Sequence, residues 1–401
     1  MRVGVAGFEP NRLTQMREAR GLSKINLGRL VERSPSTITK WEQGFHSPDA
    51  EALLALSNVL ECPMTWFTKP MSRHENNPVF FRTLATTAKD LCAASDRYME
   101  WLQEITLHLQ HDLDFPSVNI PFLEVTDHRQ IDDQMIEIMA SRCRKLWGLG
   151  LAPLSDLLLV IENAGIICSR FEQGSVVMDG YSQWNEREQR PYIILAADKN
   201  NFYRSRFDAA HELGHLVLHR YIRRLDSVNF KPIEAQAHKF AASFMLPEEA
   251  FAVELPPNPT LENFVALKQR WGMSAQAMMV RAKELQLITD VEYQRLYKQV
   301  SARGWRKGEP LDDQREPESV RLLPRSLHLL LDEGIYTKQS FVASLNMAQK
   351  DIEKLLSLPK NALSDTAILK LTPKLKVKSD SLSSDQPVDN VISIFGHKSP
   401  T

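Results

Sequence analysis

The sequence of 401 residues contains few cysteines and no long apolar segment. The four cysteines, at positions 62, 92, 143 and 168, form no CxxC pair and none of the close spacings of a disulfide framework or a thiolate zinc site. No run of about 18 apolar residues occurs, and the N-terminus lacks an apolar stretch with a cleavage signal. We therefore expect reduced cysteines, no membrane insertion, and a soluble cytoplasmic protein.

The sequence also lacks an excess of either charge, because 49 Lys and Arg residues stand against 50 Asp and Glu residues. Whole-chain charge therefore does not drive binding to nucleic acid or anionic lipid, and any such binding must be local. Hydrophobic residues make up 43% of the chain and charged residues 25%, close to the average of folded globular proteins. At about 100–200 residues per domain, this length predicts two to four domains.

Hydrophobic periodicity predicts a mainly α chain with a small α+β domain. Helical patterns occur at residues 11–67, 88–111, 131–147, 201–219, 233–246 and 260–358, and β-branched apolar runs at 165–171 and 191–196. The long amphipathic helix expected at 88–111 would link two domains. Residues 192–194 could offer a strand edge to an extended peptide, although a purely structural strand explains them equally well.

Three short helices near the N-terminus have the capping signals of a helix-turn-helix. Gly21 ends the first helix, Ser23 caps the second, and Ser34 followed by Pro35 opens the third. In the second helix, Leu27, Leu30 and Val31 are expected to face a core.

The third helix of this segment has an apolar and a polar side. Ile38 and Trp41 are three residues apart and can face inward. The outward positions are those of residue types that bind phosphates and base edges: Ser36, Thr37, Thr39 and Lys40. The pattern therefore favours a helix that enters the major groove of DNA, although a small helical interaction domain would show the same capping signals.

A second constellation, His211-Glu212-Leu213-Gly214-His215, lies within a helical pattern. Histidines four residues apart project from one face of a helix, so that both imidazoles can reach one Zn²⁺. Glu212 can then take a proton from a water molecule whose pKa the metal lowers. The alternative is a helix that merely contains these residues.

A catalytic zinc site needs a third protein ligand. Candidates are Glu234 and His238 in the following helix, and His219 one turn beyond His215. We favour Glu234, then His238, then His219. The following helix has an inward apolar face with which it can pack against the first helix and deliver a carboxylate; this face comprises Ala237, Phe240, Ala241 and Phe244.

Residues 8–68, with the run SPSTITKWEQG, resemble the five-helix Xre-type (Cro/repressor-like) helix-turn-helix domain. The resemblance implies binding to a double-stranded DNA operator, and we expect a homodimer that binds two half-sites. In this family the start of the second helix often carries Gln. Here Lys24 stands in that neighbourhood, and a lysine suits a phosphate contact.

RSRFDAAHELGHLVLHR, followed by IEAQAHKFAASFMLP, is similar to the ImmA/IrrE metallo-endopeptidase family with its second motif ExxAxxFA. The resemblance implies a zincin-like fold in which His211, His215 and Glu234 hold Zn²⁺ and Glu212 is the general base. Gln236 replaces a common acidic residue of the family. Long members fuse an Xre domain to the peptidase, and the similarity covers roughly residues 8–360.

Together with these patterns, the two resemblances imply a DNA-binding transcriptional regulator with its own zinc endopeptidase. The expected domains are a helix-turn-helix (1–70), a helical linker (71–125), the peptidase (126–258), a helical C-terminal region (259–371) and a disordered tail (372–401). The substrate would be a repressor, an antitoxin or the chain itself, and the resemblance implies stress-response, mobile-element or toxin–antitoxin control. Two alternatives are a zinc site that is a sensor or structural element without proteolysis, and a non-enzymatic antitoxin that binds a toxin.

Overall fold

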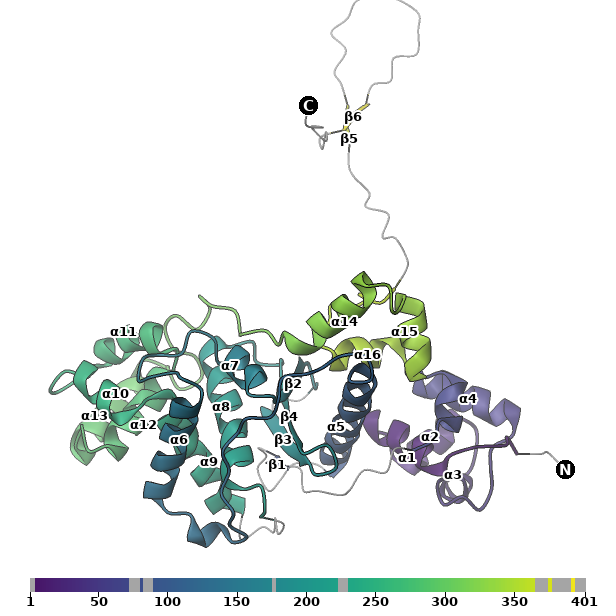
Figure 1. The fold of residues 1–401 in the computed structure, drawn as a ribbon, viewed down its shortest axis with the longest axis horizontal. Helices are drawn as coiled ribbons and strands as arrows, with labels where there is room; N and C mark the ends of the chain where they lie inside the picture. Colours follow the sequence, from purple (N-terminus) through teal and green to yellow (C-terminus); the bar gives the residue numbers. More distant parts are fainter. Residues whose placement is uncertain are drawn as a thin grey trace, which may run out of the picture. The chain divides into compact units, whose positions relative to one another are not determined.

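The computed structural model describes residues 4–71, 80–81, 89–174, 178–222, 230–364, 374–376 and 391–393. The chain divides into two compact units, Met1–Leu363 and Ser364–Thr401. The first unit is mainly helical with one small mixed sheet, which confirms the expectation of a mainly α chain with a small α+β part (Figure 1). Most of the expected tail lies outside the described residues. Within it, β5 (Lys374–Lys376) pairs antiparallel with β6 (Val391–Ser393).

The N-terminal part consists of four α-helices and a 3-10 helix. These are α1 (Pro10–Ala19), α2 (Lys24–Leu30), α3 (Pro35–Glu42), α4 (Ala50–Leu60) and η1 (Met64–Thr68). Ser23 accepts a hydrogen bond from the backbone N–H of Asn26, and Ser34 accepts one from that of Thr37, so both predicted N-caps are present.

The core of this part follows the predicted pattern with one correction. Ile38 and Trp41 of α3 are buried, as are Leu27 and Val31. Leu30 was expected in the same core, but it is 54% exposed. Because α2 is short and successive residues turn by about 100°, Leu30 points away from the stripe that Val31 continues.

Helix α5 (Lys89–Leu109) lies between the N-terminal helices and the sheet (Figure 1). The expected long helix is therefore present, and residues 101–106 are all buried, so its middle is covered on every side. The indole of Trp101 meets that of Trp66 edge to face with ring centroids 5.2 Å apart. On the opposite side, the Gln103 amide donates a 2.8 Å hydrogen bond to Gln183 of the sheet.

The sheet has the strand order β1-β3-β4-β2. Its strands are β1 (Phe80–Phe81), β2 (Ile167–Phe171), β3 (Gly180–Asn185) and β4 (Arg190–Ala196). β3 pairs antiparallel with β1 and β4, and β2 pairs parallel with β4. β4 is thus central, and the prediction that residues 192–194 offer a free strand edge is wrong.

Both faces of the sheet are covered, which explains the continuous apolar run of β4. Tyr192 and Ile194 face a cluster that includes α5, whereas Ile193 and Leu195 face the helices of the other layer. That second layer contains α6 (Asp133–Leu146), α7 (Leu157–Asn163), α8 (Phe202–Leu218), α9 (Phe230–Met245) and α10 (Glu248–Glu254).

The C-terminal helices divide between these two cores. α11 (Leu261–Trp271), α12 (Ala275–Glu284) and α13 (Asp290–Ala302) extend the core of the α8 layer. α14 (Leu322–Asp332), α15 (Lys338–Leu345) and α16 (Gln349–Leu355) join the core of α5 and the N-terminal helices. The described cysteines are free thiols, in agreement with the prediction.

Candidate metal centre and DNA-binding face

Helices α8 and α9 support the candidate metal centre. Asn201 caps the start of α8 by accepting a hydrogen bond from the backbone N–H of Arg204. The glycine of the HELGH motif lets α9 approach closely, because a Cβ on Gly214 would lie 3.1 Å from the backbone oxygen of Ala237. This close approach places Glu234 of α9 opposite the two histidines of α8.

Three candidate ligand atoms converge between these helices. The Nε2 atoms of His211 and His215 are 3.0 Å apart, and the Glu234 carboxylate lies 3.3 Å from His211 Nε2 and 3.2 Å from His215 Nε2. Tetrahedral zinc with bonds of about 2.0–2.2 Å separates its ligand atoms by roughly 3.3–3.6 Å. The observed separations of 3.0, 3.2 and 3.3 Å lie at or slightly below this range, so the residues fit a zinc ion after small side-chain shifts. One carboxylate with two neutral imidazoles suits a divalent cation.

Burial and the neighbouring histidines shift the pKa of Glu234 in opposite directions. Burial raises the pKa of its carboxyl group, but the close polar contacts with His211 and His215 outweigh that effect and hold the pKa well below its usual range. Both histidine side chains are fully buried, whereas the Glu234 side chain is 15% exposed. The site is thus reached from solvent on the Glu234 side.

The other two candidate ligands lie beside this set. His211, Glu234 and His238 also form a possible metal-binding group, with ligand atoms within 4.8 Å of one another. We favour the set that contains His215, because the imidazoles of His211 and His215 both contact the Glu234 carboxylate, at 3.3 and 3.2 Å. His219 lies behind His215, with its Nδ1 3.0 Å from Nδ1 of His215.

Glu212 faces the sheet. Its carboxylate accepts a 2.7 Å hydrogen bond from the Ser182 hydroxyl of β3, and the side chain is fully buried. A Cβ on Gly180 would lie 3.2 Å from Glu212 Cγ, so β3 passes close to this side chain and confines it. The sequence patterns identified neither β3 nor Ser182, because this strand has polar residues in the middle of its run.

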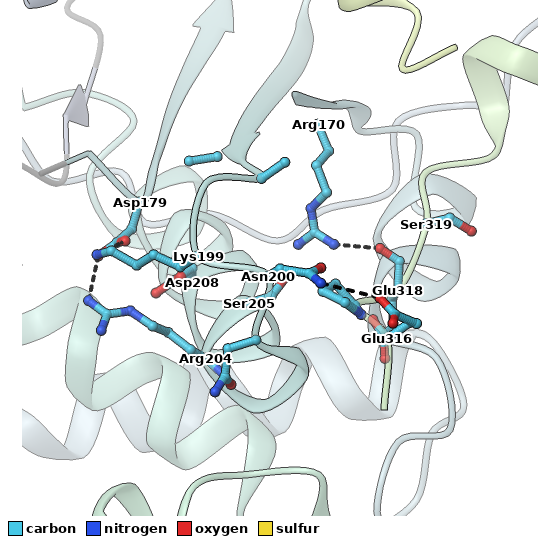
Figure 2. A pocket seen from close by; sticks show the side chains of 14 residues that line it. Arg170, Asp179, Lys199, Asn200, Arg204, Ser205, Asp208, Glu316, Glu318 and Ser319 are labelled. Carbon is cyan, nitrogen blue, oxygen red and sulfur yellow. Dashed lines mark hydrogen bonds and ion pairs between the residues drawn. The ribbon is translucent and has the colours of Figure 1, made fainter. Parts of the chain in front are cut away.

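A polar pocket of about 200 Å³ lies one helical turn before Glu212 (Figure 2). Asp208 of α8 lines it, together with Asp179, which immediately precedes β3. Asp179 forms ion pairs with Lys199 and Arg204. The remaining charged lining residues are Arg170, Glu316 and Glu318. Because both signs of charge are present, the pocket is suited to polar groups rather than to an apolar ligand.

The predicted DNA-binding residues lie around the start of α3. Ser36 and Lys40 are exposed, whereas Thr37 and Thr39 are half-buried. The Thr37 hydroxyl lies 2.9 Å from Ser34 Oγ, and that of Thr39 donates to a backbone carbonyl.

Lys24, at the start of α2, has a partner of its own. Its Nζ lies 3.1 Å from the Glu42 carboxylate, although its side chain remains 40% exposed. Lys40 and Ser36 are therefore the most accessible members of the predicted set.

Two family models match the chain. Residues 13–67 match a model described as helix-turn-helix, and residues 162–283 match a peptidase family model described as the IrrE N-terminal-like domain. No curated protein matches the chain. Within the described residues, no helix is both long enough and apolar enough to cross a membrane.

The fold, the site and these matches define a regulator-type DNA-binding domain joined to a metallopeptidase-like domain. More specifically, the two matches support a fusion of an Xre-type helix-turn-helix with an ImmA/IrrE-type domain in one chain. The second match begins in α7 and ends in α12, and it thus includes all three converging candidate ligands.

Proposed function

We propose that this protein is a DNA-binding transcriptional regulator whose ImmA/IrrE-type domain is a zinc-dependent endopeptidase. The observation that carries the proposal is that the Glu234 carboxylate of α9 meets His211 Nε2 and His215 Nε2 of α8, the helix that also holds buried Glu212. The peptidase family match supports the same reading. The peptidase domain is zincin-like in this proposal, and η1 is the fifth helix of the DNA-binding domain.

The side chains of the site have separate roles in this proposal. Zinc, when bound, supplies Lewis acidity and lowers the pKa of water. Glu212 takes the proton of the attacking water and passes it to the amine that leaves. Ser182 donates to one carboxylate oxygen of Glu212, which holds the other oxygen in a fixed direction.

We propose that the substrate is a protein segment in a repressor, an antitoxin or the chain itself. The pocket beside Asp208 would receive polar side chains of that segment, because acidic and basic groups line it together. The biological setting would be stress response, mobile-element control or toxin–antitoxin control.

For DNA binding, we propose that the start of α3 enters the major groove and that two copies bind two half-sites as a homodimer. Lys40 and Ser36 would contact the operator directly, with Thr37 and Thr39 beside them. Lys24 would exchange its Glu42 partner for a phosphate. Glu42, whose side chain is only 4% exposed, would stay paired after this exchange, because its carboxylate also contacts Arg17 at 2.5 Å.

The test uses the full zinc-loaded chain with Glu212→Gln, and Glu249→Gln as a matched control at an exposed position. Newly formed protein N-termini are measured by mass spectrometry in cells that express each version, together with zinc content. Wild type and the control should yield the same fragments, and Glu212→Gln should lower their formation about 10²–10⁴-fold with zinc retained.

Two outcomes would contradict the peptidase proposal. The first is a wild type that yields no new N-termini beyond those found in cells without the protein. Regulation of target genes that is unchanged in Glu212→Gln with zinc bound would instead support the sensor or structural alternative.

A further inference from the structure

A line of hydrogen-bonding side chains runs from the candidate metal centre toward α6. His215 Nδ1 lies 3.0 Å from His219 Nδ1, and His219 Nε2 lies 3.1 Å from Gln236 Oε1. The Gln236 amide nitrogen contacts two backbone oxygens, those of His128 at 2.8 Å and Ile131 at 2.9 Å. Both histidine side chains are fully buried.

The far end of this line fixes its direction. Backbone carbonyl oxygens only accept hydrogen bonds, so the Gln236 atom that faces His128 and Ile131 must be the NH₂ group. Its carbonyl oxygen therefore faces His219 and can only accept. It follows that His219 carries a proton on Nε2 and donates it to Gln236.

The near end requires the same direction. A histidine that binds a metal through Nε2 must have a lone pair there, so its proton stays on Nδ1. His215 must then donate from Nδ1, and the acceptor at 3.0 Å is Nδ1 of His219. A neutral His219 with its proton on Nε2 offers a lone pair at that position, which agrees with the assignment from Gln236.

We propose that His219 and Gln236 are positioning residues that hold His215 in the tautomer whose Nε2 lone pair points at the metal. The inference rests on the proposed ligand set and deepens it. The sequence left His219 open as a third metal ligand. In this proposal His219 does not bind the metal but supports His215, which does. Gln236, which departs from the acidic residue common in the family, closes the line.

A glutamine at position 236 can donate hydrogen bonds that an acidic residue there could not. A carboxylate could accept from His219, but it could not donate to the carbonyls of η2 (His128–Gln130) and of Ile131. The Gln236 NH₂ group satisfies both carbonyls, so the line is anchored to the segment that leads into α6. Because every member is neutral, the only protein charge among the converging ligands is that of Glu234.

The test compares two substitutions of similar size in the full chain. In His219→Asn, the amide oxygen can occupy the place of Nδ1 and accept from His215, whereas His219→Leu offers no acceptor. Zinc dissociation constants are measured by competition with a fluorescent chelator. We expect a 10–100-fold weaker zinc affinity for His219→Leu and a change within about threefold for His219→Asn.

A second measurement does not depend on metal or activity. In the metal-free full chain labelled with ¹⁵N-histidine, NMR should show His215 with its proton on Nδ1 in wild type and His219→Asn, and a mixture of tautomers in His219→Leu. If His219→Leu does not fold, Gln236→Met gives the same comparison, with a mixture of tautomers expected.

The failures of the two proposals are distinguishable. Equal zinc affinities for the Asn and Leu variants, or an unchanged His215 tautomer in the Leu variant, would overturn the positioning roles and leave the peptidase intact. Normal zinc binding and normal tautomers without proteolysis in wild type would overturn the peptidase and leave the positioning roles intact.

Discussion

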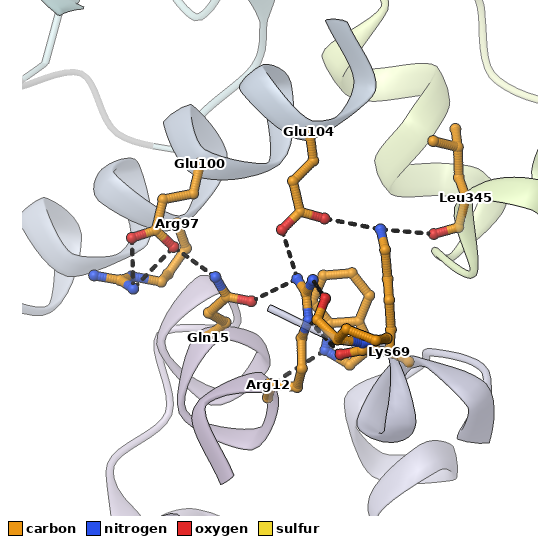
Figure 3. A network of polar contacts seen from close by, with 9 residues as sticks. Arg12, Gln15, Lys69, Arg97, Glu100, Glu104 and Leu345 are labelled. Atoms are coloured by element: carbon orange, nitrogen blue, oxygen red, sulfur yellow. Dashed lines mark hydrogen bonds and ion pairs between the residues drawn. The ribbon is translucent and has the colours of Figure 1, made fainter. Parts of the chain in front are cut away.

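Two of the regions in which the molecule buries polar groups neutralise them in different ways. At the candidate metal centre, neutral imidazoles and an amide form a directed line, and among the candidate ligands that converge there only Glu234 carries a charge. Between α1 and α5, charged side chains of both signs are buried together (Figure 3). The first arrangement leaves a negative charge that a bound cation can neutralise. In the second, the chain itself supplies the opposite charge.

The charged network centres on Glu104 of α5. Its carboxylate accepts from Arg12 of α1 at 2.7 Å and from Lys69 at 2.8 Å, and Lys69 also donates to the backbone oxygen of Leu345 in α15. The Arg12 side chain is fully buried and stacks over Trp66 at 4.5 Å. The network therefore ties the DNA-binding helices to α5 and to the C-terminal helices.

The comparison teaches that burial alone does not identify a binding site. Buried polar groups need partners in either case. What differs is whether the protein supplies all of the opposite charge. Arg12 and Lys69 surround one carboxylate, whereas His211 and His215 surround another with neutral nitrogens.

The largest expected effect is the loss of the Glu104 charge. In Glu104→Gln the shape is kept, but Arg12 and Lys69 lose their carboxylate in a buried place, so the free energy of unfolding should fall by about 3–5 kcal/mol. Urea unfolding followed by tryptophan fluorescence measures it. Glu61→Gln is the matched control, because the Lys350–Glu61 pair is 49% and 66% exposed and should contribute less than about 1 kcal/mol. Similar losses in the two variants would contradict this account.

Local features of the fold were predictable from the sequence, whereas most of the charged network was not. Ser23 and Ser34 cap their helices as expected, because capping depends on residues three positions apart. The Arg12–Glu104 contact joins residues 92 positions apart, and no periodicity signals such a pair. The burial of α5 on all sides depends on the same long-range packing.

The candidate site was predictable to a similar degree. The spacing of His211 and His215 places both on one helical face, and they do lie together. Which third residue joins them depends on how α9 packs on α8, so the sequence left Glu234, His238 and His219 open. Ser182 was missed because its partner Glu212 lies 30 positions away.

The second prediction concerns metal and stability. If zinc binds the folded site and not the unfolded chain, zinc at 100 times its dissociation constant should raise the free energy of unfolding by about 2.7 kcal/mol. Chelator-treated wild type should show this gain, and Glu104→Gln should show it too, because the two regions are separate and their effects add. Unfolding curves with and without zinc provide the measurement. An equal gain in His211→Ala would mean that zinc binds elsewhere.

The smallest expected effect on stability concerns Asp96 of α5, at the edge of the charged network. Burial raises the pKa of Asp96 to about 6, and Arg97 opposes this shift while Glu100 and Glu18 add to it. Because the folded pKa lies above the ordinary aspartate pKa of 3.8, the folded state holds the proton more tightly, and stability falls as pH rises from about 4 to 6. Asp96→Asn should therefore stabilise the protein by about 1–2 kcal/mol at pH 7.5 and have almost no effect at pH 4, as measured by urea unfolding at both values.

The control is Asp313→Asn, at an exposed position, which should leave the free energy of unfolding unchanged at both pH values. A gain for Asp96→Asn that is equal at both pH values would show that the carboxylate charge is not its cause.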